Sequence, residues 1–242
     1  MQDTSSCIMP WYWVPEDEVS ENLKAKSWDS RLILAFRDIT NATNERTFIV
    51  AGVPDTEGVG NTATLACCGV PEAALLAQLA SLPFDYVTRQ KIGGTHASIN
   101  YVKQFPVLAP DQIPDDIKWE MAKRVIELTY FNHDMDAWAE ELWKQMTEEQ
   151  REEMPNIGSK EPFIFDPERR AVLQAELDAI VAHLYGLTTD ELRYILDPED
   201  ICGHGCINET FRVLKEREIR EFGEYRTRRL VLDAWDTFGY NN

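Results

Sequence analysis

The sequence RLILAFRDITNATNERTFIVAGV, residues 31–53, contains two runs that are typical of β-strands. Residues 31–39 and 46–53 are rich in aliphatic, β-branched and aromatic side chains, and the polar residues between them carry turn chemistry. We therefore expect two neighbouring strands here. Residues 60–69, which lie between glycines, are expected to add a third strand. Together these runs predict a sheet in the first half of the chain.

Helical patterns follow the strands. Residues 71–82 begin with a proline, which is favoured at the first helical position, and continue with strong helix formers. Residues 84–92 are expected to form a second helical stretch that stops at Gly93 and Gly94. Residues 97–108 return to a strand-like pattern, and prolines end it. The first half therefore reads as mixed α/β.

The second half is predicted to be helical, because its apolar residues recur at spacings of three and four. Asp166 is a predicted N-cap with a proline in the first turn, and Thr188 with Glu191 forms a predicted capping box. Residues 148–163 are polar and contain two prolines and a glycine, so they are the predicted linker. The predicted helices comprise residues 115–131, 135–146, 166–187, 188–196, 208–222 and 224–238.

These patterns predict an α+β fold in three parts. Residues 1–110 are expected to form a mixed α/β domain. Residues 111–161 are expected to form a helical connector that includes the polar linker, and residues 162–242 a mainly helical C-terminal region. The last two helices should pair and pack back on the first domain or on a partner.

The composition is that of a globular protein, since 44% of the 242 residues are hydrophobic and 10% are aromatic. The sequence holds no run of 18 apolar residues, and its first residues lack the features of a secretory signal. Five cysteines at irregular positions do not make a disulfide framework. We therefore expect a cytoplasmic protein with reduced thiols and no membrane span.

The net charge of −18 argues against DNA binding by the chain as a whole, because Lys and Arg drive phosphate binding. The charge is unevenly spread, however. Residues 1–110 carry a balance of −4 and residues 111–242 a balance of −14. Residues 84–110 hold three basic residues and a single acidic one. The sequence therefore leaves room for a local cationic face in the first half.

The sequence holds no complete catalytic motif. Phosphate-binding glycine loops, the nucleophile elbow of hydrolases and the zinc-protease helix are absent, as is the Asp/Asn/Ser-Pro-Pro-Tyr/Phe tetrapeptide of amino-methyltransferases. Cys202, His204 and Cys206 are three metal-capable side chains close in sequence, but structural zinc needs four ligands. A glycine-rich loop explains them without a metal. We expect neither a metal site nor catalysis by this chain alone.

Two long stretches resemble the C-terminal target-recognition region of large adenine-specific DNA methyltransferases. These are the fused restriction–modification enzymes of type IIG and related methyltransferases of phage-defence systems. The first stretch, within residues 10–110, comprises RLILAFRDITNATNERTFIVAGVP, GVGNTA and LLAQLASLPFDYVTRQKIGGTHASINYVKQFPVLAP. The second, within residues 162–238, comprises FDPERRAVLQAELDAIVAHLYGLTTDELRYILDPED and ETFRVLKEREIREFGEYRTRRLVLDAW. Both occur in the order found in that family.

In that family the catalytic methyltransferase domain lies upstream and binds S-adenosylmethionine. Because its motifs are absent here, the resemblance implies the DNA-specificity portion of such a type II restriction–modification enzyme. The expected partners are double-stranded DNA and a methyltransferase domain or chain, with S-adenosylmethionine bound by that domain and no cofactor in this chain. The residues expected to contact DNA are Arg37, Asn44, Arg46, Arg89, Gln90, Lys91, Gly93, Gly94, Thr95, His96 and Lys103.

The chemistry of these residues suits DNA contact. Cations neutralise phosphates, a glutamine can pair with adenine, and adjacent glycines let a backbone approach a phosphate closely. This first hypothesis predicts a cationic patch that includes Arg37, Arg46, Arg89, Lys91 and Lys103, despite the net charge.

Two other hypotheses stay open. A protein-interaction subunit would dock through its helical half; it predicts that the basic residues pair internally with Asp38, Glu45 or Asp85, and that an apolar patch is exposed. An acidic DNA mimic would need carboxylates spaced like phosphates over one face.

Overall fold

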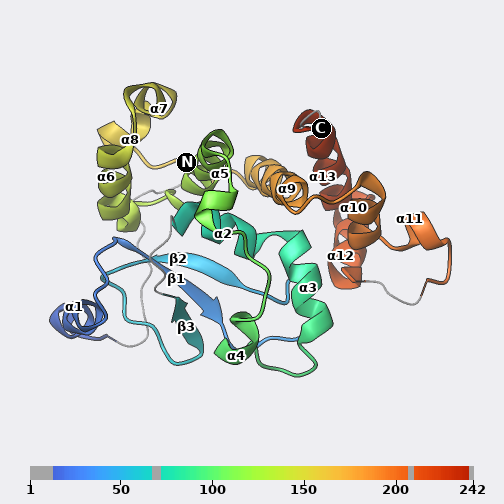
Figure 1. Cartoon of the computed structure of the whole chain (residues 1–242), viewed down its shortest axis with the longest axis horizontal. Helices are drawn as coiled ribbons and strands as arrows, with labels where there is room; N and C mark the ends of the chain where they lie inside the picture. Colours follow the sequence, from blue (N-terminus) through green and yellow to red (C-terminus); the bar gives the residue numbers. More distant parts are fainter. Residues whose placement is uncertain (1–12, 67–71, 207–209, 240–242) are drawn as a thin grey trace.

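The chain is an α+β protein, as the sequence predicts, with helices packed around a small antiparallel sheet (Figure 1). The structure is a computed structural model that describes residues 13–66, 72–206 and 210–239. Its helices are α1 (Glu16–Ala25), α2 (Glu72–Ala80), α3 (Leu82–Lys91), α4 (Ile99–Val102), α5 (Asp115–Thr129), α6 (Asp136–Gln145), α7 (Glu148–Glu153), α8 (Pro155–Ser159), α9 (Pro167–Leu184), α10 (Thr189–Leu196), α11 (Glu199–Cys202), α12 (Arg212–Phe222) and α13 (Arg226–Thr237), with short 3-10 turns η1 (Pro110–Gln112) and η2 (His133–Met135).

The sheet confirms the predicted strands. Strands β1 (Leu32–Arg37), β2 (Val50–Pro54) and β3 (Ala63–Ala66) pair antiparallel in the order β2-β1-β3 among the described residues. Residues 32–36 are all buried, which fits a central strand covered on both faces. Because β1 takes the centre, β2 and β3 are the two edges of the sheet.

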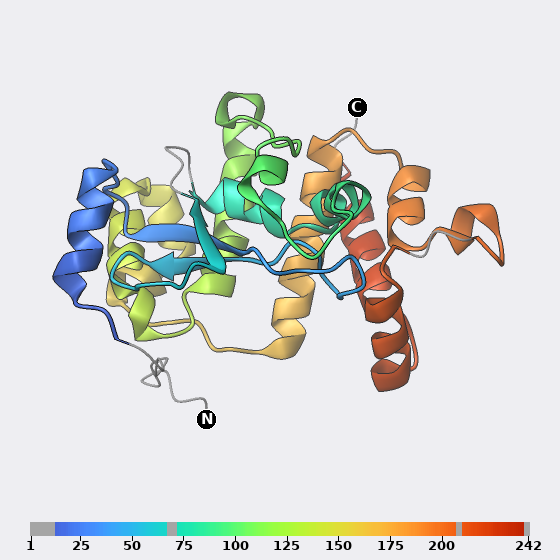
Figure 2. The same ribbon diagram turned by 90° about the horizontal axis from the view of Figure 1, so that it is seen from below.

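Two apolar cores hold the chain together, and α9 contributes to both. The first joins β1, α2, α5 and α6, and includes Leu177, Ile180 and Val181 of α9. The second joins α10, α12 and α13 to α9 through its small residues, among them Ala175 and Ala179. Figure 2 shows α9 between the part that contains the sheet and the last helices. Residues 111–161 share their core with the sheet.

The polar stretch predicted as a linker folds instead as α7 and α8. Met154 and Ile157 are buried in the first core, although charged residues surround them in sequence. Gly158 lies so close to the indole of Trp143 that a Cβ there would approach its Cζ2 atom to 2.6 Å. This segment is therefore fixed by tertiary contacts that its polar composition does not reveal.

The strand predicted over residues 97–108 is not observed. Ile99–Val102 form the short helix α4, and the extended backbone before it makes a single antiparallel bridge, between Ile39 and His96. Ser98 lies in an extended conformation at the start of α4. One bridge replaces a full strand here because the chain turns into the helix before a ladder can form.

The predicted helix starts of the second half are confirmed. The Asp166 side chain accepts a hydrogen bond from the Glu168 amide at 2.9 Å. Thr188 and Glu191 form the reciprocal capping box. The predicted cap at Asn208 lies outside the described residues. In the part of the chain that is described, no helix is both long and apolar enough to cross a membrane.

Candidate nucleic-acid interface

Arg89 lies in the interior of the protein, with 6% of its side chain exposed. Its Nε donates to the Asp85 carboxylate at 2.9 Å, and its guanidinium stacks 4.6 Å above the Phe211 ring. The two terminal nitrogens donate at 2.7 Å to the carbonyl oxygens of Ala42, Asn44, Glu45 and Thr210. A guanidinium has five N–H donors, and all five are used. None is left for a phosphate or a base in this arrangement, so the structure places Arg89 in the interior and not at a surface open to DNA.

The partner of Arg89 organises the loop between β1 and β2. Asp85 is 1% exposed and accepts hydrogen bonds from the backbone amides of Thr47 and Phe48 at 2.8 and 2.6 Å. Together Asp85 and Arg89 bind the loop through its amides and its carbonyls. Arg89 also reaches Thr210, so the same pair connects the loop with the C-terminal helices.

Apart from Ile92, which is buried, the rest of the RQKIGGTH segment is exposed. Ala97 donates to the Asp38 carbonyl at 2.7 Å and Thr40 to the Thr95 carbonyl at 2.9 Å, so the backbone of this segment is docked beside the end of β1. We call the exposed residues that it presents, together with the nearby cation of α4, the loop surface. Its members are Gln90, Lys91, Gly93, Gly94, Thr95, His96 and Lys103.

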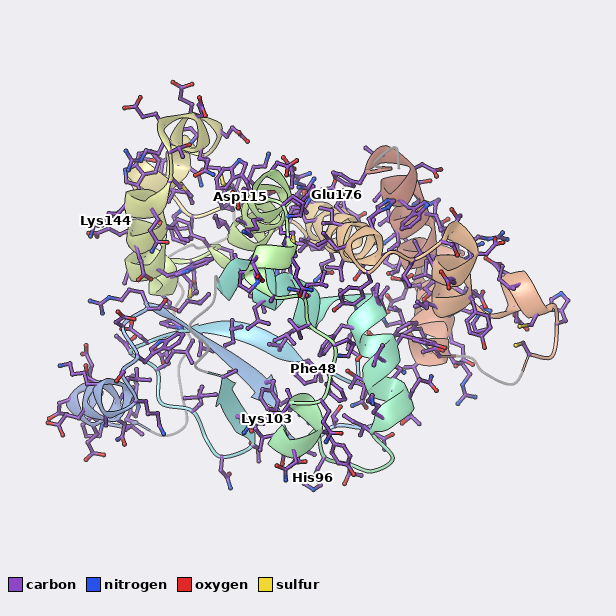
Figure 3. All side chains as sticks on the ribbon, viewed as in Figure 1. Phe48, His96, Lys103, Asp115, Lys144 and Glu176 are labelled. Carbon is purple, nitrogen blue, oxygen red and sulfur yellow. The ribbon has the colours of Figure 1, made fainter. Side chains whose placement is uncertain are left out.

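The lysines of the loop surface have no carboxylate partner. Within the described residues neither Lys91 nor Lys103 forms an ion pair, whereas His96 Nδ1 lies 2.8 Å from Asp38 Oδ2. Figure 3 shows His96 and Lys103 on the same side of the molecule, at α4 and away from Asp115. Two uncompensated cations therefore remain on a chain that is strongly acidic overall.

Gly93 and Gly94 leave open space above the loop surface. A Cβ at either position would meet no atom within 4 Å, and neither residue has a positive φ. Nothing in the described part of the chain therefore requires glycine here. The exposed apolar side chains nearby belong to Ile39, Ile99 and Tyr101.

Three of the expected residues line a groove instead of the loop surface. Arg37, Asn44 and Arg46 lie along a hollow of about 1160 Å³ between β2 and the helices α9 and α12. Arg37 is exposed at the end of β1 and has no carboxylate partner among the described residues. The structure thus divides the expected residues among the interior, the loop surface and the groove.

Two of the residues that line the groove, the half-buried Arg46 and the buried Asp178, form an ion pair. Asp178 is 2% exposed; its Oδ1 accepts from the Leu82 amide at 2.6 Å, and its Oδ2 lies 3.6 Å from Arg46 Nη2. Burial raises the pKa of Asp178 to about 6, although the Arg46 guanidinium opposes the shift. Arg46 Nη1 is buried and has no hydrogen-bond partner. The pair is thus incompletely satisfied.

The sequence analysis missed the groove residues of the second half. Asp178 and Glu218 are buried acids on helices, and Arg217 pairs with Glu45 at 2.5 Å from across the groove. A signal for Asp178 was present, because it stands between the apolar residues of α9 that form the core. No comparable signal exists for Glu218, which lies in a helix rich in charge.

The internal pairing expected for a protein-interaction subunit is found in part. Arg89 pairs with Asp85 and His96 contacts Asp38, whereas Glu45 pairs with Arg217, which was not in the expected set. The remaining cations of the loop surface stay unpaired among the described residues.

The cysteine–histidine loop does not form a metal cluster in the part of the chain that is described. The His204 side chain is fully exposed, and its Nδ1 lies 3.7 Å from Glu199 Oε1. Cys202 and Cys206 are free thiols. In comparisons with known proteins, no family model, curated protein or solved structure matches this chain.

Proposed function

We propose that this chain is the DNA target-recognition portion of an adenine-specific DNA methyltransferase or type IIG restriction–modification enzyme. The methyltransferase chemistry and its S-adenosylmethionine would reside in another domain or chain. The proposal rests on the two long stretches of sequence that resemble this family. It is supported by one observation: Lys91 and Lys103 are exposed beside the open turn at Gly93 and Gly94, and neither has a carboxylate partner in the part of the chain that the structure describes.

The RQKIGGTH segment has two roles in this proposal. Its buried part, Arg89 and Ile92, fixes the loops and helices that carry the segment. Its exposed part supplies cations for phosphates, backbone amides at the turn, and the His96 imidazole. Since the second half of the chain carries most of the negative charge, we expect weak binding with a marked dependence on salt.

The test is fluorescence anisotropy with duplex DNA between about 20 and about 200 mM salt. The informative variant is Lys91→Ala/Lys103→Ala. If both lysines contact phosphates, affinity falls and the slope of log affinity against log salt becomes shallower by about 2. Arg89 is left intact, because its replacement would disturb the fold.

The matched control is Lys24→Ala/Lys26→Ala. It removes two exposed lysines at the end of α1, which lies at a distance from α4 (Figure 1). Its affinity and salt slope should equal those of the unaltered chain. Equal losses in both double variants would indicate a non-specific charge effect. Absence of binding at the lowest salt would contradict DNA contact by this chain alone.

That negative outcome would favour the protein-interaction subunit. A specific observation supports this second candidate: apolar side chains of Ile39, Ile99 and Tyr101 are 45%, 41% and 47% exposed near the loop surface. The internal pairing of Arg89 with Asp85, which this hypothesis predicts, also agrees with it. The two candidates differ in whether Lys91 and Lys103 act on DNA.

A further inference from the structure

One edge of strand β2 has no pairing strand among the described residues. The bond from the Arg37 amide to the Ile49 carbonyl and that from the Asp55 amide to the Arg31 carbonyl fix the register of the ladder with β1. In an antiparallel pair the residues alternate between those that bond to the partner strand and those that do not. Ile49, Ala51 and Val53 therefore bond to β1.

Val50 and Gly52 consequently direct their N–H and C=O groups away from β1. No described residue forms a hydrogen bond with these four groups. A row of unpaired backbone groups at a sheet edge is a template for pairing with another chain. Val50 and Gly52 are two positions apart on this edge, so their backbone groups can pair with a short added strand.

The groove runs along this edge. All residues from 49 to 54 line it, although successive side chains of a strand point to opposite faces. A hollow that contacts residues from both faces of the strand must follow the edge of the sheet. The opposite wall is α9, including Gln174 and Leu177, and α12 contributes Leu214. Its volume of about 1160 Å³ exceeds that of most small-molecule pockets.

The groove offers one cation without a carboxylate partner among the described residues. This cation is Arg37, which lies opposite Ile49 in the ladder; Arg46 is paired with Asp178 at 3.6 Å, and its unbonded Nη1 is buried. Buried donors in folded proteins are normally satisfied, and carboxylates suit a guanidinium best. The groove is also lined by apolar residues such as Val53 and Leu177, and by acidic residues, namely Glu45, Glu57, Asp134, Asp178 and Glu218.

We propose that this groove binds an extended segment of a partner polypeptide, which adds to the sheet as a strand beside β2. The segment is apolar, and it carries an acidic side chain at the end that faces Arg37. Main-chain hydrogen bonds to Val50 and Gly52 supply affinity, and the carboxylate sets the register. This site is separate from the loop surface and does not rest on the proposed DNA contact.

The test begins with selection of nine-residue peptides from a randomised display library on the whole chain, with counter-selection on the variant Val50→Pro. Proline at position 50 removes an N–H that points away from β1, so the ladder is kept and only the donor to an added strand is lost. Thermal unfolding checks that the variant is folded. Peptides with alternating apolar residues and one acidic residue are expected.

A selected peptide is then used as the probe for amide hydrogen exchange. Exchange at Val50 and Gly52 should slow in the complex. Leu65 is the matched control, because it is exposed on β3, the opposite edge of the same sheet. Methylation of alternate backbone nitrogens in the peptide should weaken binding about tenfold or more, and Glu→Gln in the peptide by a similar factor.

Several outcomes overturn the proposal. One is a selection that enriches no peptide on the unaltered chain over Val50→Pro. Another is a bound peptide that leaves exchange at Val50 and Gly52 unchanged or that slows Leu65 equally. Slowing of the same amides by duplex DNA, or by self-association of the chain without peptide, would assign the groove to a different occupant. Loss of DNA binding in Lys91→Ala/Lys103→Ala is a separate result, since neither lysine lines the groove.

Discussion

Replacement of Arg89 by alanine should destabilise the whole fold. It removes the donor to a carboxylate that is 1% exposed and to four backbone carbonyls at 2.7 Å. Breaking a buried ion pair costs about 3–5 kcal/mol, and each buried acceptor left without a donor costs about 1–3 kcal/mol. These contributions overlap, so we expect a loss of about 4 kcal/mol or more in the free energy of unfolding.

Such a loss is large compared with the total stability of a domain, about 5–15 kcal/mol. Arg89→Lys keeps a positive charge near Asp85, but an ammonium group lacks the planar fork that reaches four carbonyls, so a loss of about 2 kcal/mol is expected. The assay is urea unfolding followed by tryptophan fluorescence. Lys91→Ala is the control, because an exposed and unpaired lysine should change stability by less than about 0.5 kcal/mol.

A loss below about 1 kcal/mol in Arg89→Ala would refute this reasoning, because the guanidinium would then not hold the loop. If the loss is as large as expected, a DNA-binding defect in an Arg89 variant reports unfolding and carries no information on contact. This is why the DNA experiment relies on Lys91 and Lys103.

Three further changes can be measured by the same unfolding assay. The pKa of Asp178 is about 6 in the folded protein and 3.8 ordinarily, so its contribution to the free energy of unfolding is complete below about pH 4 and is lost as the pH rises through about 6. Between about pH 4 and about pH 6 the free energy of unfolding of Asp178→Asn should therefore rise by about 3 kcal/mol relative to that of the unaltered chain. A difference that does not change with pH would contradict the raised pKa. Gly158→Ala forces a Cβ against the Trp143 indole and should cost about 1–3 kcal/mol; an unchanged midpoint would show that the indole moves freely. Thr188→Ala removes the capping hydrogen bond to Glu191 and should cost about 0.5–2 kcal/mol, and a smaller change would show that the box contributes little.

The elements that sequence predicts correctly are those whose signals are local. Five consecutive apolar residues predict β1, and Asp166 and Thr188 mark helix starts by their own side chains. The pattern of residues 97–108 predicts a strand because it contains β-branched and aromatic residues, but within the described segments no neighbouring strand lies beyond the bridge at His96. The burial of Ile157 likewise depends on a distant core.

The candidate site was predicted less well, because the role of an arginine depends on what surrounds it. Arg89 and Lys91 stand two positions apart in sequence, yet one lies in the interior and the other in solvent. The four-residue spacing between Asp85 and Arg89 was a usable sign of pairing on a helix. The carbonyl of Thr210, which completes the environment, could not be foreseen from the sequence around residue 89.

The position of α9 in both cores limits how this chain can be recombined with others. A junction near residue 161, where the composition changes, would separate the sheet from the helix face that covers it. Hybrids joined there should fold only if the incoming α9 keeps the volumes of Leu177, Ile180 and Val181 toward one side and of its alanines toward the other. The smallest unit that can be exchanged intact therefore spans both cores, and new specificity is more readily gained by substitution within loops than by exchange of parts.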